Sequence, residues 1–345
     1  MSWRDKSWGD KITRRKLFAG AAASFAVAAG GKALAQSKLA QTNVVQPAVA
    51  ARVKGPIVWL DMDQQELDDA YTQSVYAPNM QQILKRCVRN SELVRERIGA
   101  PKRLAYGPTP IEGMDVYLTK TKNAPVNVFV HGGAWRAEMA KDYGYPAETF
   151  VNAGAHFVVL DFNNVIETGG NLMTMVEQLR RAIIWIWKNA ESFGGDPERI
   201  YVSGHSSGGH LAGVLPTTDF LDAYDLPPNI IKGGVCGSGM FDLKAVRLSR
   251  RSSYVKFTDE IEHALSPQRH VGKLLVPVAL VYGTAETPEF QRQSLDFAAA
   301  VKSAGKPVTL SIMEGYNHFE VMEQLGNPLS QFSRAVLAQM KLGAG

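Results

Sequence analysis

The segment that most constrains this chain is residues 200–211, where a short apolar run meets a Gly-x-Ser-x-Gly motif followed by a helix-compatible run. Between a strand and a helix, this motif is typical of a nucleophile elbow, a turn so tight that the serine side chain stands exposed at its tip. Gly204 and Gly208 fit such a turn because neighbouring backbone leaves no room for side chains. The pattern predicts a nucleophile at Ser206. A bare Gly-x-Ser-x-Gly also occurs in ordinary loops, so the interpretation depends on the rest of the chain.

Apolar strand-like runs alternate with helical patterns along most of the sequence. An antiparallel pair is expected first, at residues 104–106 and 114–118. Further strands are expected at residues 126–130, 156–160, 200–203, 276–282 and 308–312. Helices are expected at residues 145–152, 172–190, 290–303 and 329–340. This alternation predicts an α/β fold with a mostly parallel central sheet covered by helices on both faces. Active sites in such sheets lie at the carboxyl ends of the strands.

A helical pattern over residues 61–97 precedes the first of these strands. It is expected either to lie over the active site as part of a cap or to pack against the edge of the sheet. Residues 36–56 are interpreted as a linker, and residues 57–345 as a single α/β domain, because about 300 residues suffice for one large core.

The N-terminal residues 1–35 resemble a bacterial twin-arginine signal peptide, with Arg14 and Arg15 before a short Ala-rich run. The run is only mildly apolar, whereas a transmembrane anchor needs about 20 strongly apolar residues. It ends in a small-x-small pattern at Ala35. We therefore expect the twin-arginine export machinery as a partner, cleavage after Ala35, and a periplasmic or secreted mature protein.

Charge and cysteine content exclude several classes of site. The net charge of +5 lies partly in the N-terminal segment, and no basic stripe with interleaved aromatic residues is visible, so nucleic acid is not an expected partner. The chain has neither Cys-x-x-Cys nor His-Glu-x-x-His, so no metal site is suggested. Its two cysteines, Cys87 and Cys236, are expected to be separate buried thiols, with a disulfide as the alternative.

A His-Gly-Gly-Ala-Trp segment follows the strand expected at 126–130. Adjacent glycines at such a position let backbone N–H groups face an oxyanion that forms during acyl transfer. The expected donors are the N–H groups of Gly132, Gly133 and Ser207. His131 is expected to be structural and to hold the loop by hydrogen bonds.

An acid and a base follow the last two strands. Glu286 lies a few residues past the strand at 276–282, and Glu289 is the alternative acid, although it falls at the start of the next helix. His318 stands on a loop after the last strand. Ser206, Glu286 and His318 occur in the chain order of nucleophile, acid and base that is typical of α/β-hydrolases. Three acids before the strand look like a solvated charged face: Asp259, Glu260 and Glu262.

Aromatic residues at the strand ends are candidates for a substrate pocket, with packing against neighbouring loops as the equal alternative. These candidates are Trp135, Tyr143 and Tyr316.

The mature chain resembles the arylformamidase (kynurenine formamidase) branch of the α/β-hydrolases, near the esterases and lipases that carry His-Gly-Gly. The matching segments are Glu66–Asp68 with Tyr71, His131–Trp135, Gly194–Ile200, Gly204–Gly208, Gly239–Leu243, Leu265–Pro267, Glu289–Ser294 and Gly315–Phe319. The resemblance implies cleavage of an N-formyl aromatic amine or a small ester. The export signal and a Glu as acid, where many relatives carry Asp, favour an environmental ester or amide.

The residues predict an acyl-enzyme mechanism without cofactor or metal, in which His318 removes the Ser206 proton and Glu286 orients the imidazole. An amidase or carbamate hydrolase would use the same residues. Two other classes stay open, a non-catalytic binding protein and a lyase on the same fold.

Overall fold

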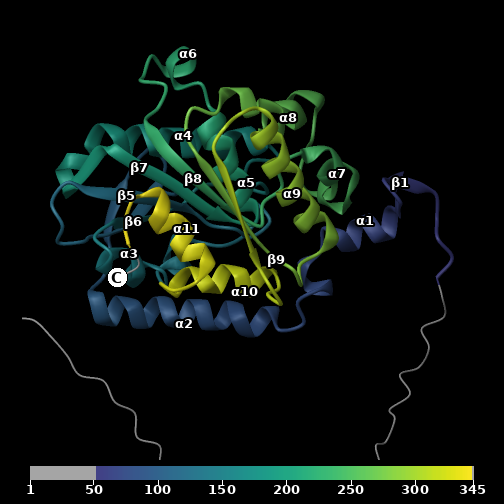
Figure 1. The fold of residues 1–345 in the computed structure, drawn as a ribbon, viewed down its shortest axis with the longest axis horizontal. Helices are drawn as coiled ribbons and strands as arrows, with labels where there is room; N and C mark the ends of the chain where they lie inside the picture. The colour runs from purple at the N-terminus through teal and green to yellow at the C-terminus, as the bar shows by residue number, and fades with distance from the viewer. Residues whose placement is uncertain (1–51, 344–345) are drawn as a thin grey trace, which may run out of the picture. The chain divides into compact units, whose positions relative to one another are not determined.

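An eight-stranded sheet forms the centre of the fold, in the order β10-β9-β8-β7-β5-β6-β4-β3 (Figure 1). The six strands from β5 to β10 are parallel to one another. At one edge β3 pairs antiparallel with β4, which pairs antiparallel with β6. The strands are β3 (Lys102–Ala105), β4 (Gly113–Tyr117), β5 (Ala124–Val130), β6 (His156–Leu160), β7 (Gly195–His205), β8 (Ile231–Gly237), β9 (Val278–Gly283) and β10 (Val308–Met313). The mostly parallel sheet and its antiparallel opening pair agree with the sequence-based expectation.

The computed structural model describes residues 52–343. Residues 53–345 form one of two units of the chain. The expected signal peptide and nearly all of the expected linker lie outside the described residues. Within residues 52–343 no helix combines the length and apolar character needed to span a membrane.

Helices cover both faces of the sheet, and strand β6 shows how the residues divide between them. Val158 and Leu160 pack into the same apolar cluster as side chains of α4 (Leu172–Asn189) and α5 (Ser207–Val214). Phe157 and Val159 join the cluster that contains side chains of α2 (Met80–Ile98), α3 (Ala147–Asn152) and α11 (Gln331–Gln339). Successive strand residues point to opposite faces, so both faces of β6 are buried. Each fully buried large apolar side chain contributes about 1.5–3 kcal/mol of transfer free energy.

The main covering helices are α2 (Met80–Ile98), α3 (Ala147–Asn152), α4 (Leu172–Asn189), α5 (Ser207–Val214), α9 (Pro288–Ser303) and α11 (Gln331–Gln339). Shorter helices are α1 (Gln64–Ala70), α6 (Phe220–Tyr224), α7 (Leu243–Leu248), α8 (Asp259–Ala264) and α10 (His318–Glu323). Among the 3₁₀ turns, η1 (Gln73–Val75) and η5 (Arg250–Ser253) lie near the site described below.

The N-terminal segment differs from a continuous helical pattern over 61–97. A short hairpin of β1 (Ile57–Trp59) and β2 (Met62–Asp63) comes first, and α1 starts only after it. Asp63 fixes this start because its carboxylate accepts the Glu66 N–H while the Glu66 side chain accepts the Asp63 N–H, a capping box.

The connection from β8 to β9, residues 238–277, holds α7, η5 and α8, and corrects one expectation. Glu262 does not belong to a solvated face: it is buried and accepts from Arg247 at 3.1 Å and from Arg269 at 2.8 Å. Asp259 and Glu260 are exposed, as expected. Cys87 in α2 and Cys236 in β8 are free and buried, which agrees with separate thiols.

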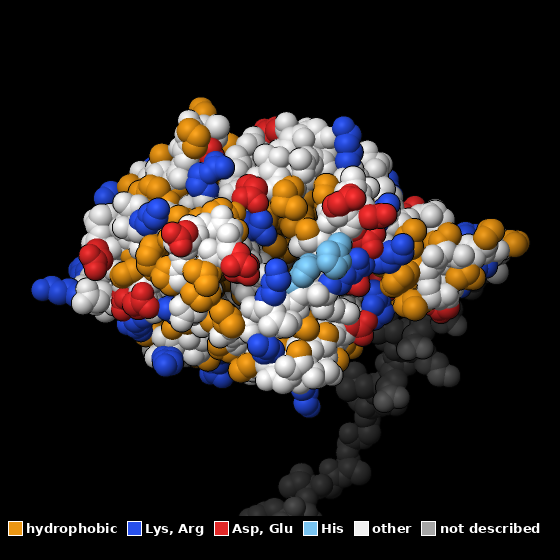
Figure 2. All heavy atoms as spheres, turned by 90° about the horizontal axis from the view of Figure 1, so that it is seen from above, with side chains coloured by type: hydrophobic (Ala, Val, Ile, Leu, Met, Phe, Trp, Pro, Cys, Tyr) orange, Lys and Arg blue, Asp and Glu red, His pale blue; other side chains and the backbone are white. Residues whose placement is uncertain are grey.

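Acidic and basic side chains are interspersed over the described part of the face shown in Figure 2, with apolar side chains between them. This mixture gives that face no continuous stripe of one charge.

Candidate active site

Ser206 lies at the turn from β7 to α5 with φ 60° and ψ −126°, a conformation that L-residues rarely adopt. A Cβ on Gly204 would lie 2.2 Å from the carbonyl oxygen of Gly208, and one on Gly208 would lie 2.0 Å from that of Val130. Backbone packing therefore requires both glycines. The Ser206 N–H donates to the Gly237 carbonyl at 2.9 Å, which fastens the turn to β8. The strand–turn–helix geometry that the motif predicts is present.

The loop after β5 approaches Ser206 closely. A Cβ on Gly132 would lie 3.2 Å from the Ser206 Cβ, so a larger residue there would crowd the serine. Gly133 has φ +90°, and a Cβ on it would lie 2.3 Å from the Ala137 carbonyl oxygen. The backbone N–H groups of Gly133 and Ser207 donate to no protein acceptor within residues 52–343. They are available to a ligand next to Ser206.

Trp135 and His210 hold this loop against the elbow helix. The Trp135 backbone N–H donates to the Ser207 hydroxyl at 3.1 Å, and its indole Nε1–H donates to His210 Nδ1 at 3.3 Å. His210 Nε2 lies 2.7 Å from the Leu265 carbonyl oxygen, so these partners assign a neutral imidazole with its proton on Nε2. Burial lowers the pKa of His210 to about 4, which agrees with that state.

His131 is a structural residue, as expected, but its ring is held by stacking against aromatic rings more than by hydrogen bonds. Its ring centroid lies 4.5 Å from that of Phe162 and 5.6 Å from that of Tyr143. Nδ1 has one contact, 3.3 Å from the Gly132 carbonyl oxygen, and Nε2 has no partner within the described chain.

His318 and Glu286 are brought into direct contact. His318 Nδ1 donates to Glu286 Oε2 at 2.7 Å, and both side chains are buried. The other carboxylate oxygen, Oε1, accepts from the Ser238 hydroxyl at 2.5 Å and from the Gly283 N–H at 2.8 Å. These donors orient the Glu286 carboxylate toward the imidazole. His318 opens α10, and Asn317 caps that helix by accepting the N–H groups of its first turn.

The alternative acid, Glu289, lies elsewhere. It accepts from the Tyr71 hydroxyl at 2.8 Å and forms an ion pair with Arg292 at 2.7 Å. Gln293 of the same helix donates to the Tyr71 hydroxyl and to the Asp242 carbonyl. Glu289 therefore joins α9 to the N-terminal segment, and Glu286 is the acid next to His318.

Burial controls the charge state of this pair. It raises the pKa of Glu286 to about 7, opposed by the donors Ser238 and Gly283. Burial, together with the positive charge of Arg251, lowers the pKa of His318 to about 3. His318 is thus neutral at pH 7, with its proton on Nδ1 and Nε2 open to accept another. A neutral imidazole of this kind meets the requirement for a general base.

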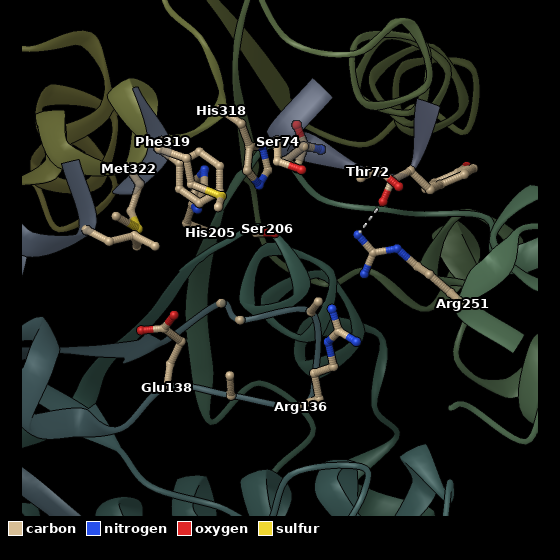
Figure 3. A pocket seen from close by; sticks show the side chains of 18 of the residues that line it. Thr72, Ser74, Arg136, Glu138, His205, Ser206, Arg251, His318, Phe319 and Met322 are labelled. Carbon is tan, nitrogen blue, oxygen red and sulfur yellow. Dashed lines mark hydrogen bonds between the residues drawn. The ribbon is translucent and has the colours of Figure 1, made fainter. Parts of the chain in front are cut away.

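A pocket of about 540 Å³ opens onto Ser206 and His318 (Figure 3). This volume suits a small organic ligand. The N-terminal segment supplies part of the wall through side chains that include Tyr71, Met80 and Leu84. Within residues 52–343 no cluster of three or more His, Cys, Asp or Glu side chains is arranged to hold a metal ion.

Of the predicted aromatic residues only Tyr143 lines this pocket. Trp135 is fully buried beneath the glycine loop, where its ring packs edge-on against His210, and Tyr316 also lies off the pocket. The expectation that these two line the site is therefore corrected. Sequence reasoning also missed Ser238 and Arg251, which no local motif marks. Tyr71 belongs to a segment of the family resemblance, which was the one available signal for it.

Comparisons with known proteins agree with this geometry. The BD-FAE family model matches residues 114–231. The kynurenine formamidase of Danio rerio is 29% identical over 280 residues, covering 77% of this chain and 93% of its own length. An isoprenylcysteine α-carbonyl methylesterase of Arabidopsis thaliana is 25% identical over 246 residues, which cover 65% of this chain and 57% of the methylesterase. The solved structure of esterase LipW from Mycobacterium marinum has a TM-score of 0.60 at 17% identity, covering 78% of this chain and 89% of its own, and shows the shared fold.

The chain has the α/β-hydrolase fold and is similar in sequence to the arylformamidase and His-Gly-Gly esterase group. Its enzymatic class is therefore that of a hydrolase. In this α/β-hydrolase, segments of the resemblance that are far apart in sequence meet around Tyr71, through the bonds of its hydroxyl to Glu289 and Gln293. The Gln293 side-chain oxygen in turn accepts the N–H groups of Phe241 and Asp242.

Proposed function

We propose that the protein hydrolyses a small carboxylic ester or an N-formyl or aryl amide through an acyl-enzyme on Ser206. The observation that carries the proposal is the 2.7 Å hydrogen bond from His318 Nδ1 to Glu286, on loops that follow neighbouring strands, with the base and Ser206 lining one pocket. The curated relatives, named as a formamidase and a methylesterase, support both substrate classes.

The chemistry needs only residues of this chain. His318 Nε2 takes the Ser206 proton as the serine oxygen attacks the carbonyl carbon, and Glu286 stabilises the imidazolium that forms. The N–H groups of Gly132, Gly133 and Ser207 donate to the tetrahedral oxyanion. His318 then protonates the leaving alcohol or amine. Water hydrolyses the acyl-enzyme in a second cycle with the same base.

The test compares wild type with Ser206→Ala on p-nitrophenyl acetate, p-nitrophenyl butyrate and N-formylkynurenine. Hydrolysis that disappears in the variant supports Ser206 as the nucleophile, and the ratio of kcat/KM values on ester and formamide decides between esterase and formamidase. An aryl carbamate in the same panel tests the carbamate alternative. If no substrate shows Ser206-dependent turnover, the proposal fails and a binding role on this fold replaces it.

We also propose that residues 1–35 direct the protein through the twin-arginine pathway to the periplasm or the medium. The Arg14-Arg15 pair and the short Ala-rich run before Ala35 support this. Replacement of both arginines by lysine is expected to leave the protein in the cytosolic fraction of a bacterial host. N-terminal sequencing of the exported form would locate the cleavage site, and an unprocessed chain would contradict the proposal.

A further inference from the structure

One wall of the pocket contains a buried cation without a carboxylate partner. Arg251 of η5 is 4% exposed and is the only lysine or arginine that is buried within residues 52–343. No Asp or Glu of the described chain forms an ion pair with it, whereas the less buried Arg292 and Arg269 each contact two. Its recorded hydrogen bonds go to neutral oxygens, the Tyr71 carbonyl at 3.1 Å and the Tyr254 hydroxyl at 3.2 Å.

The guanidinium therefore has unused donors. An arginine offers five N–H groups in a planar fork, and two bonds are made here. Nε is buried and has no partner within the described residues. The rings of Trp135 and Tyr71 lie 5.5 Å and 6.0 Å from Cζ, so the charge is flanked by aromatic surface instead of water. A buried charge in such surroundings is costly unless an opposite charge joins it.

The pocket places this cation beside the reaction centre. Arg251, Ser206 and His318 line the same cavity, and in Figure 3 the guanidinium projects toward it. Its positive charge reaches His318, whose pKa it lowers. Glu138, another charged residue of the wall, lies on the opposite side of the cavity in this view. Within residues 52–343 no carboxylate pairs with Arg251, so an anionic ligand in this cavity would supply the missing partner.

We propose that Arg251 determines specificity by binding a carboxylate of the substrate, so that the preferred ester or amide is a monoanion. The planar fork matches a carboxylate, and one unpaired buried cation is neutralised by one negative charge. The proposal rests on the proposed hydrolase function. In this proposal η5, which lies in the connection between β8 and β9, contacts the carboxylate of the substrate and not the bond that is cleaved.

The first test uses matched neutral and anionic esters. In the first pair, phenyl acetate is neutral and 4-acetoxybenzoate carries a carboxylate on the leaving group. In the second pair, phenyl butyrate is neutral and monophenyl succinate carries a carboxylate on the acyl group. Uncatalysed rates are subtracted from each measurement. Wild type is expected to favour the anion of at least one pair by about tenfold or more in kcat/KM. Arg251→Gln is expected to remove most of this preference, lowering kcat/KM on that anion about tenfold or more further than on its neutral partner. Arg251→Lys recovers part of the loss because it keeps the charge without the fork.

The matched control is Arg250→Gln, which removes a neighbouring charge that also lines the cavity but is exposed to solvent. It is expected to change the anion preference by less than about threefold, since solvent screens it. A preference below about twofold for both ester pairs in wild type, or one that survives in Arg251→Gln, overturns the proposal. Ser206-dependent turnover of the neutral esters would still stand in that case, so the two proposals fail separately.

A binding measurement covers the case in which the Arg251 variants are unstable or the chosen esters are poor substrates. Benzoate is titrated calorimetrically into the Ser206→Ala protein, with benzamide as the uncharged analogue. Benzoate is expected to bind about tenfold or more tightly than benzamide, and to compete with phenyl acetate in the wild-type reaction. Equal or weaker binding of benzoate would overturn the assignment of Arg251, whatever the catalytic result.

Discussion

At the residue scale, the chemistry of the site depends on two titratable groups that burial acts on in opposite directions. Desolvation disfavours the charged form of each, so it raises the pKa of Glu286 and lowers that of His318. The donors Ser238 and Gly283 act against burial on the carboxylate. The imidazole of His318 is therefore neutral and donates to the Glu286 carboxylate. Ser238 and Gly283 hold that carboxylate in place.

Glu286→Gln tests this arrangement. The amide nearly keeps the shape, but its NH₂ group favours the wrong imidazole tautomer, so kcat on p-nitrophenyl acetate is expected to fall by roughly 10²- to 10⁴-fold with little change in KM. Glu289→Gln is the matched control. It disrupts the buried pair with Arg292 and is expected to lower the melting temperature more than kcat. Equal losses of kcat in the two variants would contradict the role of Glu286.

The pH profile gives a second test. The base acts when unprotonated, and His318 has a pKa lowered to about 3, so it stays neutral as the pH falls below the usual histidine value of about 6.5. The acid limb of kcat/KM is therefore expected below about pH 6.5. Stopped assays with a neutral ester across this range measure it. A limb near pH 7 would contradict this expectation and show that protonation of Glu286, with its raised pKa, limits the reaction.

The sequence carried enough information to predict Ser206, Glu286 and His318 as candidates, because each follows a strand and their order along the chain is characteristic. It could not indicate Ser238 or Arg251. The contact of Ser238 with Glu286 exists only because β8 lies beside β9, and Arg251 stands in a run of charged and polar residues that resembles solvated surface. Both depend on contacts between distant parts of the chain.

At the scale of elements, glycines set how closely the strands and the elbow helix approach. They also explain why β8 was not predicted: Ile231–Gly237 contains three glycines, which are poor strand formers, and shows no clear alternation. In the fold these glycines are needed. A Cβ on Gly237 would lie 2.6 Å from the Phe332 ring of α11, and one on Gly233 would lie 2.3 Å from Gln339.

Gly208→Ala is expected to disrupt the elbow. Its Cβ would lie 2.0 Å from the Val130 carbonyl oxygen and 2.4 Å from that of His131, and backbone cannot yield there without moving β5. We expect a loss of about 3 kcal/mol or more in the free energy of unfolding, together with loss of turnover. Chemical denaturation measures the first. Gly272→Ala is the control, because a Cβ there meets nothing within 4 Å, and its cost is expected to stay within about 0.5 kcal/mol.

At the scale of the whole molecule, every residue of the candidate site lies in the unit from Val53 onward. A variant that begins at Val53 is therefore expected to keep kcat/KM within about twofold of the full chain. One that begins at Met80 also loses the β1–β2 hairpin, α1 and η1, and with them the buried Leu67 and Tyr71. It is expected to melt at a lower temperature and lose turnover. Equal activity of the two variants would show that residues 53–79 do not contribute to the pocket.

The connection that carries Arg251 leaves the sheet at β8 and returns at β9, two strands that are hydrogen-bonded to each other. Its ends are thus fixed by the sheet, while its interior, residues 238–277, lines the pocket only through η5 and Tyr254, the residue that follows it. In such an arrangement the segment 238–277 can be replaced by one of different length or charge without displacing the strands that precede Glu286 and His318. Selectivity and reactivity can then diversify separately, by grafting a loop onto an unaltered scaffold.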